Sequence, residues 1–208
     1  MQPLEAKVHC EQWPELPLLK VAGLAEFAAG IFPPERMLLD LRDAQVRAAG
    51  SAIYRLPWAG FLTDVPEHAP PSRPWIAVPQ GAFKVGVGDV VELRPHASKM
   101  ALRYRRGSNN NILFTTERCN SYCLMCSQPP REVDDGWRVS QLCDLIELVD
   151  KDAPSLTVTG GEPTLLGKDL QRVVLRCAEV LPRTRLHVLS NGRAFEDGAL
   201  ARIFEGLH

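Results

Sequence analysis

The sequence centres on an eight-residue loop, Cys119-Asn120-Ser121-Tyr122-Cys123-Leu124-Met125-Cys126, which directly follows a predicted strand at Ile112 to Thr116. Its three cysteines have the spacing CxxxCxxC, so three thiolates can face one side of a metal cluster. Four thiolates would close an iron–sulfur cube or a zinc site, whereas three leave one metal position open for a small ligand. We therefore predict metal ligation by Cys119, Cys123 and Cys126.

No nearby residue completes a four-ligand site. Cys143 is the next cysteine, but it lies in a helical pattern, and no histidine occurs between Ser121 and Val180. Cys143 and Cys177 lie on or beside the apolar stripes of predicted helices, so we interpret both as core residues. A zinc clip, or cysteines buried without a metal, is the alternative interpretation of the loop.

Predicted strands and helices alternate from Asn111 onward. The strands are Ile112 to Thr116, Ser155 to Thr159 and Arg185 to Leu189, and the helices are Val139 to Val149, Asp169 to Leu181 and Glu196 to Leu207. This alternation predicts a parallel sheet with right-handed crossovers. Ligands bind beyond the carboxyl ends of such strands, so the loops that follow the three strands are expected to meet there.

Residues 1 to 107 are predicted to form a smaller α+β domain, to which the sequence assigns no role. Strands are expected at Trp75 to Val78, Asp89 to Leu93 and Leu102 to Arg105, the last two antiparallel because apolar and charged residues alternate. Helices are expected at Leu18 to Ala29 and from Pro33 to Leu41. We place the domain boundary near Arg106, and the second domain spans residues 108 to 208.

Composition favours a globular protein of a reducing compartment. The 208 residues carry a formal net charge of −1, and we predict neither a nucleic-acid nor a membrane partner. No secretory signal is evident, and Glu26 interrupts the longest apolar stretch, Val21 to Phe32, so we expect a cytoplasmic protein. Three of the six cysteines share one loop, which suits metal binding better than a disulfide scaffold.

The three loops resemble, in their order, the motifs of the radical S-adenosylmethionine (SAM) superfamily. CxxxCxxC follows the first strand of the second domain, Gly160-Gly161-Glu162-Pro163 the second, and Leu189-Ser190-Asn191-Gly192 the third. A closer resemblance is to the radical SAM maturase of the His-Xaa-Ser peptide system. It is carried by Arg106-Gly107-Ser108, Thr116-Glu117-Arg118-Cys119-Asn120 and Cys123-Leu124-Met125-Cys126-Ser127-Gln128-Pro129-Pro130.

The resemblance implies a fold and two cofactors. Residues 108 to 208 would form the first three β/α units of a partial (β/α)6 barrel, with a [4Fe–4S] cluster on the three cysteines and SAM on the open iron. Gly160 and Gly161 would let the backbone approach SAM, Glu162 would bind its amine, and Pro163 would stiffen the loop.

Two further SAM-binding positions follow from the resemblance. Asn191 would lie beside SAM, after the third strand. Met125 would pack near the adenine, at a position where the superfamily usually has an aromatic residue, because its polarizable sulfur can contact a ring face.

The resemblance also implies an activity. The enzyme would generate a 5′-deoxyadenosyl radical to modify a peptide with His-Xaa-Ser repeats, alongside a second radical SAM maturase and an electron donor. No catalytic residue is named. The alternatives are a non-catalytic iron–sulfur or scaffold protein and a zinc-binding interaction module.

The chain stops after three β/α units, so we expect half of the barrel to be missing, as in a fragment or a truncated gene product. The third strand would then form an open edge of the sheet, making the chain sticky or dependent on a partner. Cluster binding is expected to persist, with weak or absent SAM turnover.

Overall fold

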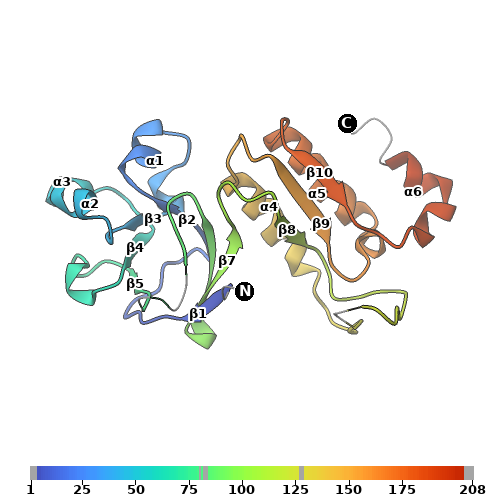
Figure 1. Cartoon of the computed structure of the whole chain (residues 1–208), viewed down its shortest axis with the longest axis horizontal. Coiled ribbons are helices and arrows are strands. Elements are labelled where there is room, and N and C mark those ends of the chain that lie inside the picture. Colours follow the sequence, from blue (N-terminus) through green and yellow to red (C-terminus); the bar gives the residue numbers. More distant parts are fainter. Residues whose placement is uncertain (1–3, 80, 82–83, 127–128, 204–208) are drawn as a thin grey trace. The chain divides into compact units, whose positions relative to one another are not determined.

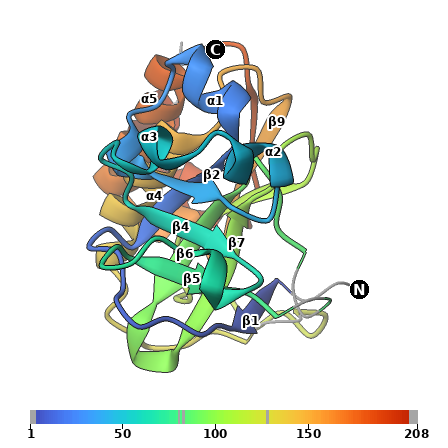
Figure 2. The same cartoon turned by 90° about the vertical axis from the view of Figure 1, so that its left-hand side faces the viewer.

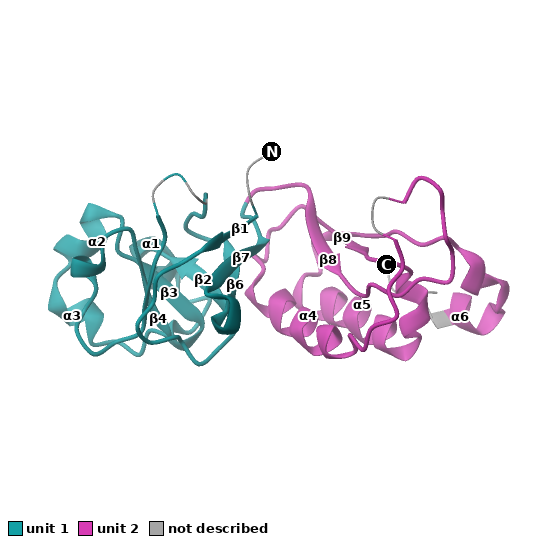
Figure 3. Ribbon diagram, turned by 90° about the horizontal axis from the view of Figure 1, so that it is seen from below, with its two compact units in different colours: residues 1–106 teal, residues 107–208 magenta. Residues whose placement is uncertain are grey.

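A computed structural model describes residues 4–79, 81, 84–126 and 129–203 of the chain (Figure 1). The chain divides into two compact units, residues 1–106 and residues 107–208 (Figure 3). The sequence predicts this division one residue later. Within the described part, no helix combines the length and the apolar character needed to cross a membrane.

The first unit contains a seven-stranded mixed sheet with the order β1-β7-β6-β2-β3-β4-β5. Strands β2 to β5 run parallel, whereas β6, β7 and β1 are joined to the sheet by antiparallel pairing. The strands are β1 (Glu5–Lys7), β2 (Leu18–Ala22), β3 (Met37–Asp40), β4 (Gly60–Thr63), β5 (Trp75–Ala77), β6 (Val90–Arg94) and β7 (Lys99–Tyr104). The α-helices are α1 (Leu24–Ala29), α2 (Ala44–Ala48) and α3 (Ser51–Tyr54), and the 3-10 helices are η1 (Pro34–Arg36), η2 (Pro66–His68) and η3 (Pro95–Ala97).

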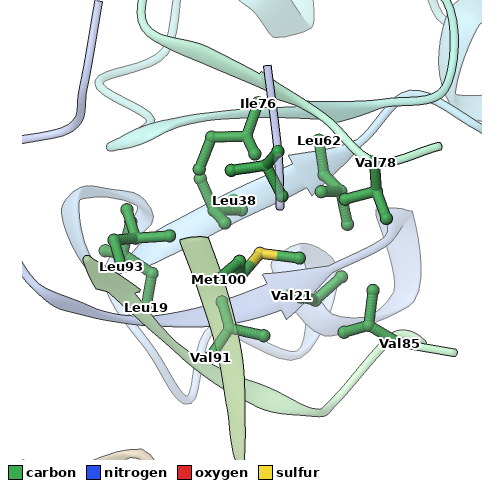
Figure 4. Close-up of a cluster of buried hydrophobic side chains, with 11 residues drawn as sticks. Leu19, Val21, Leu38, Leu62, Ile76, Val78, Val85, Val91, Leu93 and Met100 are labelled. Atoms are coloured by element: carbon green, nitrogen blue, oxygen red, sulfur yellow. The ribbon is translucent and has the colours of Figure 1, made fainter. Parts of the chain in front are cut away.

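The sheet of the first unit curls, so that its two ends approach one another (Figure 2). A bridge between His9 and Ala77 joins the segment after β1 to β5, with N to O distances of 3.0 and 2.8 Å. Buried apolar side chains, from the strands and from the segments beside them, gather in one core (Figure 4). Its members are Val8, Leu19, Val21, Leu38, Leu62, Ile76, Val78, Val85, Val91, Leu93 and Met100.

The prediction of two helices near the start of the chain is largely wrong. Leu18–Ala22 is strand β2, and only Leu24–Ala29 is helical; Pro34–Arg36 forms a short 3-10 turn that leads into strand β3. Leu38 and Leu39 face opposite sides of β3, yet neither is exposed. A strand buried on both faces shows no alternation of apolar and polar residues, so its apolar run resembles a buried helix. The strands expected as β5, β6 and β7 are confirmed, including the antiparallel pairing of β6 and β7.

The second unit contains a parallel three-stranded sheet with the order β10-β9-β8. The strands are β8 (Asn111–Phe114), β9 (Ser155–Thr159) and β10 (Arg185–Val188). The helices are α4 (Trp137–Leu148), α5 (Lys168–Val180) and α6 (Gly198–Ile203), with 3-10 helices η4 (Pro163–Leu166) and η5 (Arg193–Glu196). The alternation predicted from the sequence is therefore confirmed as an α/β arrangement, although residues 204–207 of the last expected helix lie outside the described residues.

Helices α4 and α5 lie on the same side of β8 and β9 (Figure 3). They bury apolar stripes at the expected spacing: Val139, Leu142, Leu145 and Ile146 on α4, and Leu170, Val173, Val174 and Cys177 on α5. Cys177 is thus a core residue, as predicted, while Cys143 on α4 is half-buried. Burial, with a smaller contribution from Cys143, raises the pKa of Cys177 to about 12.

Strand β10 lies at the end of its sheet, as predicted, and pairs with β9 in the described part of the chain. Its side chains are the least covered of the three strands, with Val188 and the following Leu189 both exposed. The free edge presents backbone donors and acceptors that could pair with another strand.

Candidate metal centre

The three cysteines of the CxxxCxxC loop follow β8, on one exposed stretch of chain. Cys119 is half-buried, Cys123 and Cys126 are exposed, and none of the three forms a disulfide. A backbone hydrogen bond from Cys126 N to Cys123 O, 3.0 Å long, closes a tight turn around the second and third cysteines. The cysteine loop, defined here as residues 119–126, therefore combines one shielded thiol with two that solvent and metal ions can reach.

Apolar side chains of the cysteine loop project into solvent. The exposed fractions of Tyr122, Leu124 and Met125 are 83%, 102% and 96%. Met125, the residue expected beside an adenine, is therefore not packed against the other predicted site residues. Such exposure is unfavourable for side chains of this kind and suits a surface that becomes covered when a ligand binds.

The segment that carries the cysteine loop is held together at its base by hydrogen bonds; we call this base the neck. Arg131 N donates to Glu117 O over 3.1 Å, which brings the two ends of the segment together. The buried carboxylate of Asp135 accepts hydrogen bonds from Thr116 Oγ1 at 3.1 Å and from Glu117 N at 2.7 Å. Arg138, at the start of α4, adds an ion pair to Glu117 at 2.8 Å. The cysteine loop thus leaves a rigid base that α4 supports.

Asp135 and Arg138 did not emerge from the sequence analysis. Their hydrogen bonds with Glu117 join residues 18 and 21 positions apart, which no local pattern encodes. The only local signal was the pair Asp134-Asp135 just before a predicted helix, a position where acidic residues are common because they interact favourably with the helix dipole.

Gly160 and Gly161 approach the root of the cysteine loop closely. A Cβ on Gly160, whose φ is +152°, would lie 2.6 Å from Thr116 O, and one on Gly161 would lie 2.1 Å from Arg118 O. Two hydrogen bonds hold this contact: Gly161 N to Thr116 O at 2.7 Å and Glu162 N to Arg118 O at 2.9 Å. The glycine pair was expected to make room for SAM. In this structure the neighbour that requires glycine is the chain's own backbone.

Glu162 is almost fully buried, with 1% of its surface exposed. Its Oε1 accepts hydrogen bonds from Thr164 N at 3.0 Å, Thr164 Oγ1 at 2.5 Å and Ser190 Oγ at 2.8 Å, and its Oε2 accepts one from Asn191 N at 2.7 Å. Burial alone would raise the pKa of this carboxyl, but the hydrogen bonds outweigh burial and lower it. Pro163 is buried as well and opens η4.

The loop after β10 completes the arrangement. Asn191 Nδ2 donates to Asn120 Oδ1 at 2.8 Å and to Ser121 Oγ at 3.3 Å. Arg193 Nη1 donates to Asn120 O at 3.1 Å and to Ser121 Oγ at 3.2 Å. The expected meeting of the three loops beyond the carboxyl ends of β8, β9 and β10 is therefore confirmed. Sequence analysis missed Arg193, which follows a recognised motif without belonging to it.

The available ligand atoms are of the type that binds iron–sulfur clusters, because three cysteine thiols outside any disulfide lie on one short loop and no histidine is close in sequence. The thiols are not drawn together, however. Among the described residues, no three His, Cys, Asp or Glu side chains are grouped so that they could hold a metal ion. A cluster would have to gather the two exposed thiols toward Cys119, a movement that the solvent-exposed tip of the loop permits.

Three comparisons with known proteins identify no relative of this chain. No family model, no curated protein and no solved structure matches this chain.

Proposed function

We propose that the second unit binds a [4Fe–4S] cluster through Cys119, Cys123 and Cys126, and that SAM occupies the open iron. The observation that carries the proposal is the convergence of three loops at one end of a parallel sheet, where the cysteine loop meets Gly160-Gly161-Glu162 and Asn191. Parallel α/β sheets place their ligands at this end. The arrangement of free thiols supports a metal cluster rather than a disulfide framework.

When bound, a reduced cluster and SAM supply a 5′-deoxyadenosyl radical that removes a hydrogen atom from the substrate. The role of this chain's own residues would be to bind and orient these two cofactors. The thiols ligate, the neck formed by Asp135 and Glu117 fixes where the loop starts, and Asn191 and Arg193 hold its first half. The exposed Tyr122, Leu124 and Met125 provide apolar surface that would exclude water once they pack against a bound ligand.

The proposed substrate is a peptide with His-Xaa-Ser repeats, modified together with a second radical SAM maturase and an electron donor. This part of the proposal rests on the resemblance of the segments around Arg106 to Ser108, Thr116 to Asn120 and Cys123 to Pro130 to the maturase of that system.

Anaerobic reconstitution with iron and sulfide tests the proposal. The wild-type protein should take up iron and sulfide and turn brown, and Cys119→Ala, Cys123→Ala or Cys126→Ala should each abolish the colour. Cys143→Ala is the matched control, since this thiol lies on α4 and should not contribute. Reduction in the presence of SAM should then release 5′-deoxyadenosine.

Two results would point to the competing functions. A stable cluster without SAM cleavage would indicate a non-catalytic iron–sulfur or scaffold protein. Tight zinc binding without iron uptake would indicate a zinc-binding interaction module.

A further inference from the structure

We propose that Glu162 is a positioning residue for the cysteine loop and does not contact SAM. The carboxylate joins the loop after β9 to the loop after β10, which in turn holds Asn120 and Ser121. The inference rests on the proposed function only for what the cysteine loop binds; the positioning itself is a property of the protein without cofactors.

The first step of the argument is the occupancy of the carboxylate. Four donors already contact the ionised carboxylate, three at Oε1 from Thr164 and Ser190 and one at Oε2 from the Asn191 backbone, so each oxygen already accepts from the protein. With 1% of its surface exposed, Glu162 has almost no face left for a ligand. An ammonium group could reach it only by displacing packed protein, at the cost of buried hydrogen bonds.

The second step is the connection to the cysteines. Glu162 N donates to Arg118 O, adjacent to Cys119, so the residue that carries the carboxylate is fixed to the root of the cysteine loop. Its Oε2 fixes the backbone of Asn191, whose side chain reaches Asn120 and Ser121. One buried side chain therefore determines the position of the amide group that donates to both Asn120 and Ser121.

The third step is the internal geometry of the loop after β10. Ser190 Oγ donates to Glu162 and accepts from Gly192 N at 3.0 Å, and Asn191 Oδ1 accepts from Arg193 N at 3.1 Å. These bonds form a compact turn, so a displacement of its first residues would also move Arg193. Loss of the Glu162 contact should consequently release all the bonds to Asn120 and Ser121 together.

The test is hydrogen exchange of the cofactor-free protein, with Glu162→Gln as the isosteric variant. In either orientation, the glutamine amide nitrogen faces a backbone N–H, that of Asn191 or that of Thr164, and leaves this donor without an acceptor. Exchange should accelerate about tenfold at the amides of Asn191, Arg193 and Cys126, which donate to Glu162 Oε2, Asn191 Oδ1 and Cys123 O, because this is the change that one unpaired buried donor produces. Peptides of α5 should keep wild-type rates.

Asn191→Ala is the second variant, and it keeps the test decisive even if Glu162→Gln does not fold, because Asn191 is an exposed side chain. It should accelerate exchange at Arg193 and Cys126, and the double variant should accelerate these amides only slightly more than the stronger single variant, as expected for residues acting in one chain of contacts. Asn110→Ala, an exposed asparagine at the opposite end of β8, is the matched control and should change nothing in the loop.

A spectroscopic measurement adds a readout that general stability would not move. After reconstitution and reduction without SAM, both variants should alter the electron paramagnetic resonance spectrum of the cluster, because the loop that carries its ligands is displaced. If both variants keep wild-type exchange rates at the amides named above, the inference is overturned. If the wild-type protein takes up no iron, the proposed function fails, while the exchange rates still decide the role of Glu162.

Discussion

Gly161 carries a steric requirement that no other residue type can meet. A Cβ at this position would lie 2.1 Å from the carbonyl oxygen of Arg118, a backbone atom that cannot rotate away. We predict that Gly161→Ala pushes the two loops apart and lowers the free energy of unfolding by about 1–3 kcal/mol, as overpacking does elsewhere. Chemical denaturation followed by circular dichroism measures this loss.

The matched control is Gly136→Ala. Gly136 has helical angles, φ −57° and ψ −27°, and the nearest atom to an added Cβ is Asp134 Oδ1 at 3.8 Å. Alanine fits there, so its effect should stay within about 1 kcal/mol in either direction. Equal losses from the two substitutions would show that the contact at Gly161 relaxes without strain.

Glu162 should make stability depend on pH in a defined direction. Burial raises its pKa, but hydrogen bonds from Thr164, Asn191 and Ser190 lower it by more than burial raises it. The folded-state pKa therefore lies below the ordinary 4.5. A lowered pKa contributes stability above the unfolded-state pKa, and this contribution is lost as the pH falls through the folded-state value. Denaturation from pH 7 to pH 3 should therefore show the gap between wild type and Glu162→Gln narrowing below 4.5. A gap that stays constant with pH would mean that the carboxylate is not ionised in the fold.

Helix α5 offers a test of packing at the scale of one element. Leu170 is fully buried on the face toward the sheet, while Leu175 on the same helix is 38% exposed. We expect Leu170→Ala to lower the free energy of unfolding by about 2–5 kcal/mol, through lost burial and the cavity left behind. Leu175→Ala should cost less than about 1 kcal/mol. Similar losses in urea denaturation would contradict this assignment of the buried face.

Elements that bury one face could be predicted from the sequence, and elements that bury two could not. In α5, Leu170, Val173, Val174 and Cys177 recur at helical spacing, so its bounds came within a residue of those found. In β2 and β3 both faces are covered, so neither strand alternates apolar and polar residues, and the sequence pattern predicts helices there.

The candidate site divides in the same way. The meeting of the three loops followed from a general property of parallel sheets, and the hydrogen bond between Asn191 and Asn120 confirms it. The partners of Glu162 did not follow, because a carboxylate after a strand is compatible with a ligand, a cap or a link between loops. Only tertiary geometry distinguishes these, as it does for Asp135, to whose carboxylate Thr116 and Glu117 donate from 19 and 18 residues earlier in the chain.

At the scale of the whole molecule, each of the two units buries apolar residues of its own within the described part of the chain. The cluster around Leu38 and Met100 draws on residues of the first unit alone, and the buried residues of β8, β9, α4 and α5 belong to the second. The proposed metal centre lies entirely in the second unit. The cysteine loop and its supports therefore belong to the unit in which Leu156 and Leu170 are buried.

Separate cores predict separate local stabilities. Leu38 in the first unit and Leu156 in the second are both almost fully buried, with 0% and 1% of their surface exposed, so the same substitution to alanine leaves a comparable cavity in each. Leu38→Ala should accelerate hydrogen exchange in peptides of β2, β3 and β6 and leave those of β8, β9 and the cysteine loop at wild-type rates, because local opening follows contiguous cooperative units. Leu156→Ala should do the reverse. Exchange measured by mass spectrometry on the full chain reads both units in one experiment. Equal acceleration in both units from either substitution would show that the chain opens as a single cooperative body and that the first unit contributes to holding the cysteine loop.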